Sequence, residues 1–335
     1  MEAQSPASKY LTELVAKFPD APALTLAKTA YRECPEYWNT LEVCRSAVRR
    51  LLGVAGKEKR EGMKDKRFIR EPRKAGWTDV IPEALIQLPD WKAFEIPGPH
   101  RALILSDVHI PFHHIGALEQ ALQYGLDNKT TLILLNGDIV DHYSLSKWVT
   151  DPKLRDFPGE VRSARHFLKG LRKRFPKTRI VYRHGNHEDR LETFLRFKAP
   201  ELLGLPNIEW SEIFGLDEWN IELIKQKRPI RLGELNVLHG HEHRYAISNP
   251  VNPARGLFLR AKDHALCGHF HQASQHSDTT VRGKVISTWS TGCLCDLNPE
   301  YSPINNWCLG FAFVSIDSDG GFHVDNKRII GGQVY

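Results

Sequence analysis

The stretch LILLNGDIVDHYS, residues 132–144, decides the fold class of this chain. It begins with four aliphatic residues, which indicate a strand, and then becomes polar. Gly137 lets the backbone turn after the strand, so that Asp138 projects from the strand end. A carboxylate has two oxygens, and Asp138 can therefore bridge two cations.

Four other segments repeat this pattern of an apolar run followed by polar residues. They are LILSDVHIPFHH (103–114), VYRHGNHEDR (181–190), NVLHGHEH (236–243) and ALCGHFHQ (265–272). Asp107 and His109 are two residues apart, so both side chains can point the same way from a strand end. The corresponding polar residues of the other three segments are Asn186, His187, His239, His269 and His271. Open α/β sheets place their sites at such strand ends.

Short apolar, β-branched runs from about residue 99 onward predict a series of strands. They lie at 101–106, 130–136, 179–184, 234–239, 264–269, 284–289 and 310–317. Helical periodicity at 115–126 and 160–175 separates the first of these strands. Strand–helix alternation followed by a strand-rich C-terminal half predicts an α/β sandwich, with sheets inside and helices outside.

Residues 1–56 differ from the rest and have helical periodicity, which predicts a small all-α module. Its third helix is expected to start at Asn39, with Asn39 and Glu42 in the N-cap and N3 positions of a capping box. Arg45 and Arg49 share one face of this helix. Three short helices with a basic third helix resemble a helix-turn-helix DNA-binding module. A small helical appendage with a solvated charged face fits the same pattern.

Charge and composition indicate the kind of partner and the compartment. The formal net charge of +6 over 335 residues favours anionic partners. Residues 57–98 are a connecting segment, and 57–76 within it are dense in Lys and Arg, which makes them a candidate phosphate-backbone contact. Signal-peptide and transmembrane runs are not found, so we expect a cytoplasmic protein without a membrane partner. The six cysteines lack metal-finger spacing and are expected to be mainly buried free thiols.

Taken together, the five polar motifs resemble the signature of calcineurin-like metallophosphoesterases. The motifs are D-x-H at 107–109, G-D-x-x-D at 137–141, G-N-H-E at 185–188, H-G at 239–240 and G-H-x-H at 268–271. NGDIVDHYSLSKW and TGCLCDLNPEY are further similar to phage- and prophage-type members, which would place the protein in the host cytoplasm. The resemblance implies a two-sheet α/β/β/α sandwich, with residues 99–335 as the catalytic domain.

The resemblance also implies a metal-dependent phosphoric ester hydrolase with two divalent ions. One ion would be held by Asp107, His109, Asp138 and His271, and the other by Asp138, Asn186, His239 and His269. Nitrogen and oxygen ligands without thiolate suit Mn, Fe or Zn. We expect Mn, with Fe, Zn, Ni and Mg as alternatives. Such a pair generates a hydroxide from bridging water and stabilises in-line displacement.

By the same resemblance, His187 is the catalytic acid that protonates the leaving oxygen. Glu188 or a nearby carboxylate is expected to orient it. Ser/Thr protein phosphatases of this superfamily carry arginines where this chain has His142 and His184, and losing both bidentate groups argues against that class. His142, His184, His113 and His241 are candidate substrate contacts, with structural hydrogen bonds as the alternative role for His113 and His241.

A phosphodiester carries less charge than a monoester dianion, and histidines can still contact it. We therefore expect phosphodiester hydrolysis by a nuclease or nucleic-acid phosphodiesterase, with the N-terminal basic helix and linker contacting DNA or RNA. The basic helix at 160–175 suits the same partner. The alternative is a phosphomonoesterase or small-nucleotide hydrolase whose N-terminal module does not bind nucleic acid.

Overall fold

A computed structural model describes residues 5–53, 91–224, 227–243 and 251–335. The chain divides into two units, Met1–Pro89 and Asp90–Tyr335, and each is described by itself. Most of the connecting segment expected at 57–98, including its basic part, lies outside the described residues. No helix among the described residues is long and apolar enough to cross a membrane.

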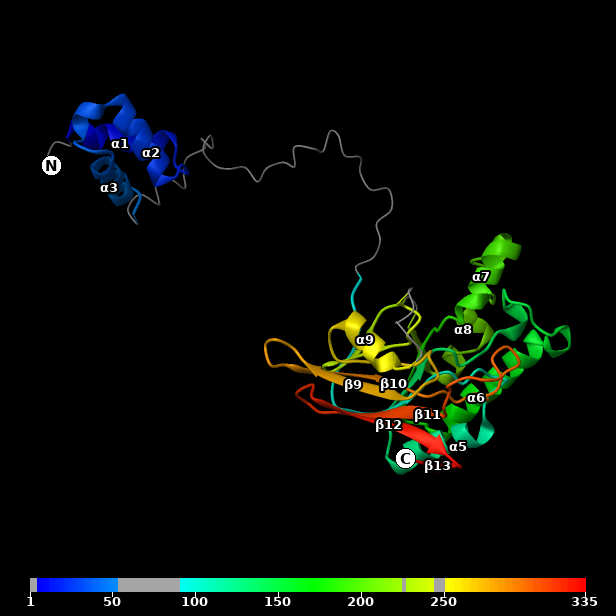
Figure 1. Cartoon of the computed structure of the whole chain (residues 1–335). Coiled ribbons are helices and arrows are strands. Elements are labelled where there is room, and N and C mark those ends of the chain that lie inside the picture. The colour runs from blue at the N-terminus through cyan, green and yellow to red at the C-terminus, as the bar shows by residue number, and fades with distance from the viewer. Residues whose placement is uncertain (1–4, 54–90, 225–226, 244–250) are drawn as a thin grey trace. The chain divides into compact units, whose positions relative to one another are not determined.

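The described part of the first unit is helical (Figure 1). Its elements are α1 (Pro6–Lys17), α2 (Ala23–Glu33), the 3-10 turn η1 (Pro35–Tyr37) and α3 (Leu41–Leu51). Cys44 and Val48 of α3 are fully buried in a small core with Leu26 and Ala27 of α2. This apolar face holds α3 in place and leaves Arg49 exposed.

The capping box expected for the third helix is wrong by one residue. Thr40, not Asn39, is the N-cap, because its backbone is extended and its hydroxyl accepts the N–H of Val43 at 3.3 Å. Glu42 instead pairs with Arg45 at 3.5 Å. Asn39 and Thr40 are both favourable N-cap residues, so sequence preference alone does not separate them.

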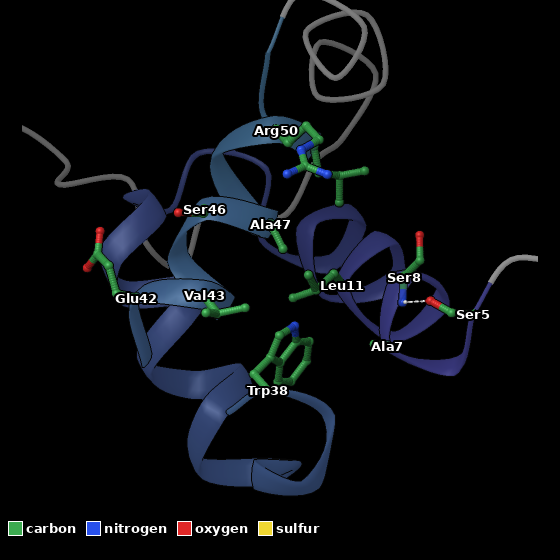
Figure 2. Close-up of a pocket in the computed structure, with 11 residues that line it drawn as sticks. Ser5, Ala7, Ser8, Leu11, Trp38, Glu42, Val43, Ser46, Ala47 and Arg50 are labelled. Carbon is green, nitrogen blue, oxygen red and sulfur yellow. Dashed lines mark hydrogen bonds between the residues drawn. The ribbon is translucent and has the colours of Figure 1, made fainter. Parts of the chain in front are cut away.

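A groove of about 620 Å³ lies on this unit between α1 and α3 (Figure 2). Leu11 and Ala47 line it together with Trp38, and Val43 at its edge has 52% of its surface exposed. Arg50 also borders it, so apolar and cationic groups adjoin on the basic helix.

Two β-sheets form the centre of the second unit. The seven-stranded sheet has the order β13-β12-β11-β2-β3-β4-β5, and the six-stranded sheet has the order β1-β6-β7-β8-β10-β9. The first contains β2 (His100–Leu105), β3 (Leu132–Asn136), β4 (Arg179–Arg183), β5 (Ile221–Ile224), β11 (Gly310–Ile316), β12 (Phe322–Ile330) and β13 (Gln333–Val334). The second contains β1 (Phe94–Ile96), β6 (Ile230–Leu232), β7 (Leu235–Leu238), β8 (Ala265–Cys267), β9 (Ser274–Thr279) and β10 (Val285–Ser290).

Helices cover the outer face of each sheet (Figure 1). The larger sheet is covered by α5 (Ile115–Asp127), α6 (Phe157–Arg174), α7 (Asp189–Lys198) and α8 (Trp210–Ile213), and the smaller sheet by α9 (Pro253–Ala261). Leu103 and Leu105 of β2 point to the helices, whereas Ala102 and Ile104 point to the other sheet, because side chains alternate along a strand. The expected α/β/β/α sandwich is confirmed.

The strands that were not expected include β1, β5, β6 and β13, which have two to four residues each, and the polar strand β9. β1 pairs with β6, so the smaller sheet begins upstream of residue 99, within the segment interpreted as a connection. β9 has the polar sequence SQHSDT and lies at a sheet edge, where burial does not require apolar residues. Every strand expected from an apolar run is present.

Candidate metal centre

Five strand ends bring the polar motifs together. β2, β3 and β4 are parallel neighbours, and Asp107, Asp138 and Asn186 follow their carboxyl ends. β7 and β8 are also parallel neighbours, followed by His239 and His269. Carboxyl ends of parallel strands meet at one edge, so the two sheets present their polar loops to a common space.

The first cluster contains the residues assigned to one metal ion. His271 Nε2 lies 3.3 Å from Asp107 Oδ1 and 3.3 Å from His109 Nε2. His109 Nε2 is 4.0 Å from Asp138 Oδ2. All four side chains are buried. Burial alone would raise the pKa of Asp107, but His271 outweighs it and lowers that pKa.

The second cluster shares Asp138. Its Oδ2 lies 3.2 Å from His239 Nε2, and the ligand atoms of Asp138, His239 and His269 are within 4.8 Å of one another. Asn186 lines the adjoining cavity with His109. Burial opposes ionisation of Asp138, yet the neighbouring His239 and other histidines hold its pKa well below the usual range. Asp138 is therefore an ionised carboxylate between the two clusters.

Hydrogen bonds orient two of the histidine rings toward the centre. His109 Nδ1 lies 2.9 Å from Asp141 Oδ2, and His239 Nδ1 lies 2.7 Å from the backbone oxygen of Asn136. A proton on Nδ1 leaves the lone pair of Nε2 facing inward, which is the arrangement of metal-binding histidines.

Unpaired buried atoms support a cation site. Asn186 Oδ1 is buried without a hydrogen bond to any described residue, and Asp107 Oδ1 and His239 Nε2 also lack a hydrogen bond of good geometry, although His271 Nε2 and Asp138 Oδ2 lie 3.3 and 3.2 Å from them. Leaving such an atom unpaired costs about 1–3 kcal/mol, and native structures normally avoid it. Carboxylate, amide and imidazole donors are those that Mn, Fe and Zn accept. The residues present therefore fit two divalent ions.

The backbone of the centre is strained. The left-handed region holds Asp107, His109, Asp138, His269 and His271, with φ of 53–67°. Non-glycine residues rarely adopt it, and such strain clusters at functional sites. Gly137 has φ +88°, and a Cβ there would lie 2.6 Å from His239 Nδ1. Glycine is therefore required for the close approach of the two loops.

Glu188 fastens two of the loops together. Its buried carboxylate accepts the N–H groups of Asp138 at 2.9 Å, Ile139 at 2.8 Å and Gly185 at 2.7 Å. It also accepts the hydroxyl of Tyr182 at 2.7 Å. Glu188 is thus occupied with the backbone that presents Asp138.

Asp141, rather than Glu188, orients His187. The Nδ1 atom of His187 lies 2.8 Å from the backbone oxygen of Asp141 and 3.4 Å from its Oδ2. His187 Nε2 accepts from Arg190 Nη2 at 3.0 Å. A ring nitrogen of His187 also lies within 4.8 Å of ligand atoms of His109 and Asp138. These distances are compatible with His187 as a proton-transferring acid and as a metal ligand. Mutation of His187 is the test that distinguishes the two roles.

Glu242 holds the loop that carries His239. Its carboxylate accepts the N–H of His239 at 3.0 Å and of Gly240 at 2.6 Å, and pairs with fully buried Arg183 at 2.6 Å. Burial alone would raise the pKa of Glu242, but Arg183 outweighs it and lowers the pKa to about 2. Sequence reasoning missed this pair, because the partners lie on strand ends of different sheets.

His142, interpreted as a substrate contact, is fully buried. Its ring packs against Phe157 and Phe214, with centroids 5.8 and 5.6 Å apart, and its Nδ1 lies 2.8 Å from the backbone oxygen of His187. Burial lowers its pKa to about 4, so it is neutral. In this structure His142 supports the His187 loop and does not reach the cavity.

The other three substrate candidates also lie outside the lining of the cavity formed by the described residues. His184 packs against Trp210 at 4.7 Å between ring centroids. His241 packs against His239 at 5.2 Å, and burial lowers its pKa to about 3. His113 forms a β-bridge with Cys295. A contact with substrate remains a prediction for these three residues.

Cys295 lies at the centre although the sequence did not single it out. Its Sγ is 3.9 Å from His271 Nδ1 and within 4.8 Å of ligand atoms of His109 and His271. A hydrogen bond with Cys293 and burial both raise the pKa of Cys295, which keeps it a thiol. In the sequence, the Cys293-x-Cys295 spacing is the feature that could have pointed to Cys295.

Glu160 of α6 provides a pH-dependent prediction. It is buried against the backbone N–H of His142, and burial raises its pKa from 4.5 to about 8. The folded protein thus retains a proton that the unfolded chain releases, so stability falls as pH rises from about 4.5 to 8. Glu160→Gln should flatten this decline, whose limit is about 1.4 kcal/mol per pH unit.

Urea unfolding of both proteins between pH 5 and 8.5 measures the effect. The exposed Glu192→Gln is the matched control and should retain the wild-type slope. Equal slopes for wild type and Glu160→Gln would contradict the assignment.

The comparisons with known proteins agree with the class that this fold and site define. The family model of calcineurin-like phosphoesterases matches residues 100–273, more than half of the chain. The chain therefore belongs to the calcineurin-like phosphoesterase family, whose members are metal-dependent phosphoester hydrolases that use two metal ions.

The Gene 54 protein of Mycobacterium phage L5 is 25% identical over 247 residues, which are 70% of this chain and 95% of that protein. Among solved structures, Vacuolar Protein Sorting 29 from Cryptosporidium parvum is 12% identical with a TM-score of 0.37, covering 71% of this chain and 95% of that one. The phosphoesterase YfcE from E. coli is 14% identical with a TM-score of 0.31, covering 68% and 98%.

Proposed function

We propose that this enzyme hydrolyses phosphodiesters of nucleic acids or nucleotides. The observation that carries the proposal is the charge of the cavity of about 1060 Å³ beside the metal centre. Among its described lining residues, Arg190 is the one Lys or Arg, and it already contacts the Asp141 backbone and His187. A monoester dianion would need more cationic contacts than a diester monoanion.

The ring of His142 is buried and does not contact a phosphate, so this histidine does not favour a diester in the folded chain. The charges of the cavity lining favour the diester instead. Asp151, Asp296 and Glu300 also line the space, so its outer part is acidic. A second negative charge on the phosphate would face these carboxylates, and the described lining has no second Lys or Arg to offset them, which favours the diester.

The roles of the residues follow from their positions. Metal ions held by the two clusters would supply Lewis-acid polarisation of the phosphoryl oxygen. His187 lines the cavity, and its Nδ1 is anchored on Asp141, so its Nε2 is the atom that would transfer a proton to the leaving oxygen. To do so, Nε2 must be protonated and give up the hydrogen bond that it accepts from Arg190 at 3.0 Å. Glu188 keeps Asp138 in place, and Glu242 keeps His239 in place.

A substrate panel with Mn²⁺ and the full chain tests the proposal. We expect bis(p-nitrophenyl) phosphate and nucleic-acid substrates to be cleaved with higher kcat/KM than p-nitrophenyl phosphate. Cyclic nucleotides and single- and double-stranded DNA and RNA complete the panel. Cleavage of monoesters alone would contradict the proposal and favour a phosphomonoesterase.

We also propose that the first unit binds a nucleic-acid backbone through α3. Arg49 and Arg50 are exposed near its C-terminal end. The basic helix α6 is a weaker candidate than its sequence suggested. Arg165 pairs with Glu218 at 2.6 Å, and Arg172 donates to four backbone oxygens. These two side chains fasten α6 internally.

The double variant Arg49→Ala/Arg50→Ala should weaken binding to DNA or RNA and lower the salt slope by about one per lost phosphate contact. Fluorescence anisotropy with labelled single- and double-stranded oligonucleotides, at several salt concentrations, measures both. Lys28→Ala/Arg32→Ala on α2 removes the same charge from exposed positions and is the control. Equal losses in both variants would mean that only net charge matters.

A further inference from the structure

The cavity beside the metal centre has aromatic walls that the hydrolytic step does not require. Trp148 follows β3 in the chain, and Tyr301 and Trp307 follow β10. Trp148 and Tyr301 line the cavity with 69% and 72% of their surfaces exposed. Exposed rings at a functional cavity indicate a binding surface.

These rings extend up to the proposed metal ligands. Trp307 packs edge-on against His271 with centroids 4.0 Å apart, and Tyr301 packs against Trp307 at 6.2 Å. Phe112, close to His109 in sequence, packs against Tyr143 at 5.2 Å. A group attached to a phosphate at the centre therefore lies next to planar apolar surfaces.

The charge of the cavity determines what kind of planar group fits. Asp151, Asp296 and Glu300 repel a continuing row of phosphates, and Arg190 is already engaged. An uncharged nucleobase stacks on aromatic rings, and its exocyclic amino groups donate to carboxylates. A base within a duplex is stacked and paired, and enters such a cavity only after leaving the helix.

We propose that this cavity binds one unpaired nucleobase of the substrate, stacked against Trp148 and Tyr301, while the attached phosphodiester lies at the metal centre. This rests on the phosphodiesterase function proposed above and narrows its substrates to nucleotides and single-stranded nucleic acid. Duplex regions are excluded.

Two chromogenic diesters test the base site in the full chain with Mn²⁺. Thymidine 5′-(p-nitrophenyl phosphate) carries the base, and the same ester of 1,2-dideoxyribose lacks it. We expect the wild type to prefer the thymidine ester. Trp148→Ala and Tyr301→Ala should each lower the ratio of the two kcat/KM values about tenfold. Trp91→Ala and Tyr335→Ala, exposed to 65% and 64%, are matched controls that keep the ratio.

The outcomes separate the base site from the hydrolytic function. Equal kcat/KM for the two esters, or equal loss on both in Trp148→Ala, overturns the base site while phosphodiesterase activity stands. If neither diester is cleaved but p-nitrophenyl phosphate is, the phosphodiesterase proposal fails. Saturation-transfer NMR with adenosine then decides: a signal abolished in Trp148→Ala supports the base site, and no signal with wild type overturns it.

Discussion

Asn in place of Asp138 is expected to lower turnover by more than about a hundredfold and to lower the bound metal content. Loss of a residue that only supports a ligand costs about 10–100-fold in metal affinity or activity. Asp138 lies between both clusters, 3.2 Å from His239 Nε2 and 4.0 Å from His109 Nε2, so its loss should affect both ions. Mass-spectrometric metal analysis and kcat with a diester measure the two effects.

Asn is chosen because it keeps the shape of the side chain and the oxygen that accepts the backbone N–H of His187 at 2.9 Å. The fold should therefore be retained in Asp138→Asn, and circular dichroism verifies this. A loss of metal can then be assigned to the lost carboxylate and not to unfolding. The control is Asp127→Asn, an exposed carboxylate at the end of α5. Two tightly bound ions and wild-type turnover in Asp138→Asn would refute the shared-ligand assignment.

Replacing His187 by Asn should retain the metal ions and lower turnover by about 10²–10⁴-fold. The reason is its anchored ring: Nδ1 is held 2.8 Å from the Asp141 backbone oxygen, and Nε2 transfers the proton once it is protonated and has left Arg190. A p-nitrophenolate leaving group needs little protonation. The loss should therefore be much smaller on p-nitrophenyl esters than on alkyl or nucleoside diesters.

His166→Asn is the matched control, because His166 is exposed on α6. Metal content and kcat are measured for both variants with both kinds of leaving group. Loss of a metal ion in His187→Asn would show that His187 is a ligand. An equal loss on both leaving groups would remove its role as the acid.

Local sequence determined much of this protein. The apolar runs that predicted β2, β3, β4, β7 and β8 are strands, because a short β-branched run between polar turns has few alternatives to a buried strand. The motifs follow those strands directly. Their convergence was therefore predictable once the strands were assigned to parallel sheets.

The tertiary structure decided the features that depend on residues distant in the chain. Glu188 fastens the backbone around Asp138, and Arg183 pairs with Glu242 beneath His239. Glu188 belongs to the G-N-H-E motif, but its hold on the Asp138 backbone, like the pairing of Arg183 with Glu242, depends on a partner from another loop. β9 was missed for a related reason, since an edge strand with polar residues has no apolar pattern of its own.

The placement of His142 shows the same division. The sequence determined that a histidine follows G-D-x-x-D, where related phosphatases have arginine. Only the fold decided that its ring turns away from the cavity and packs against Phe157 and Phe214. Spacing along a strand determines which residues leave its end. The direction of a side chain in the following loop depends on packing between elements that meet only in the folded chain.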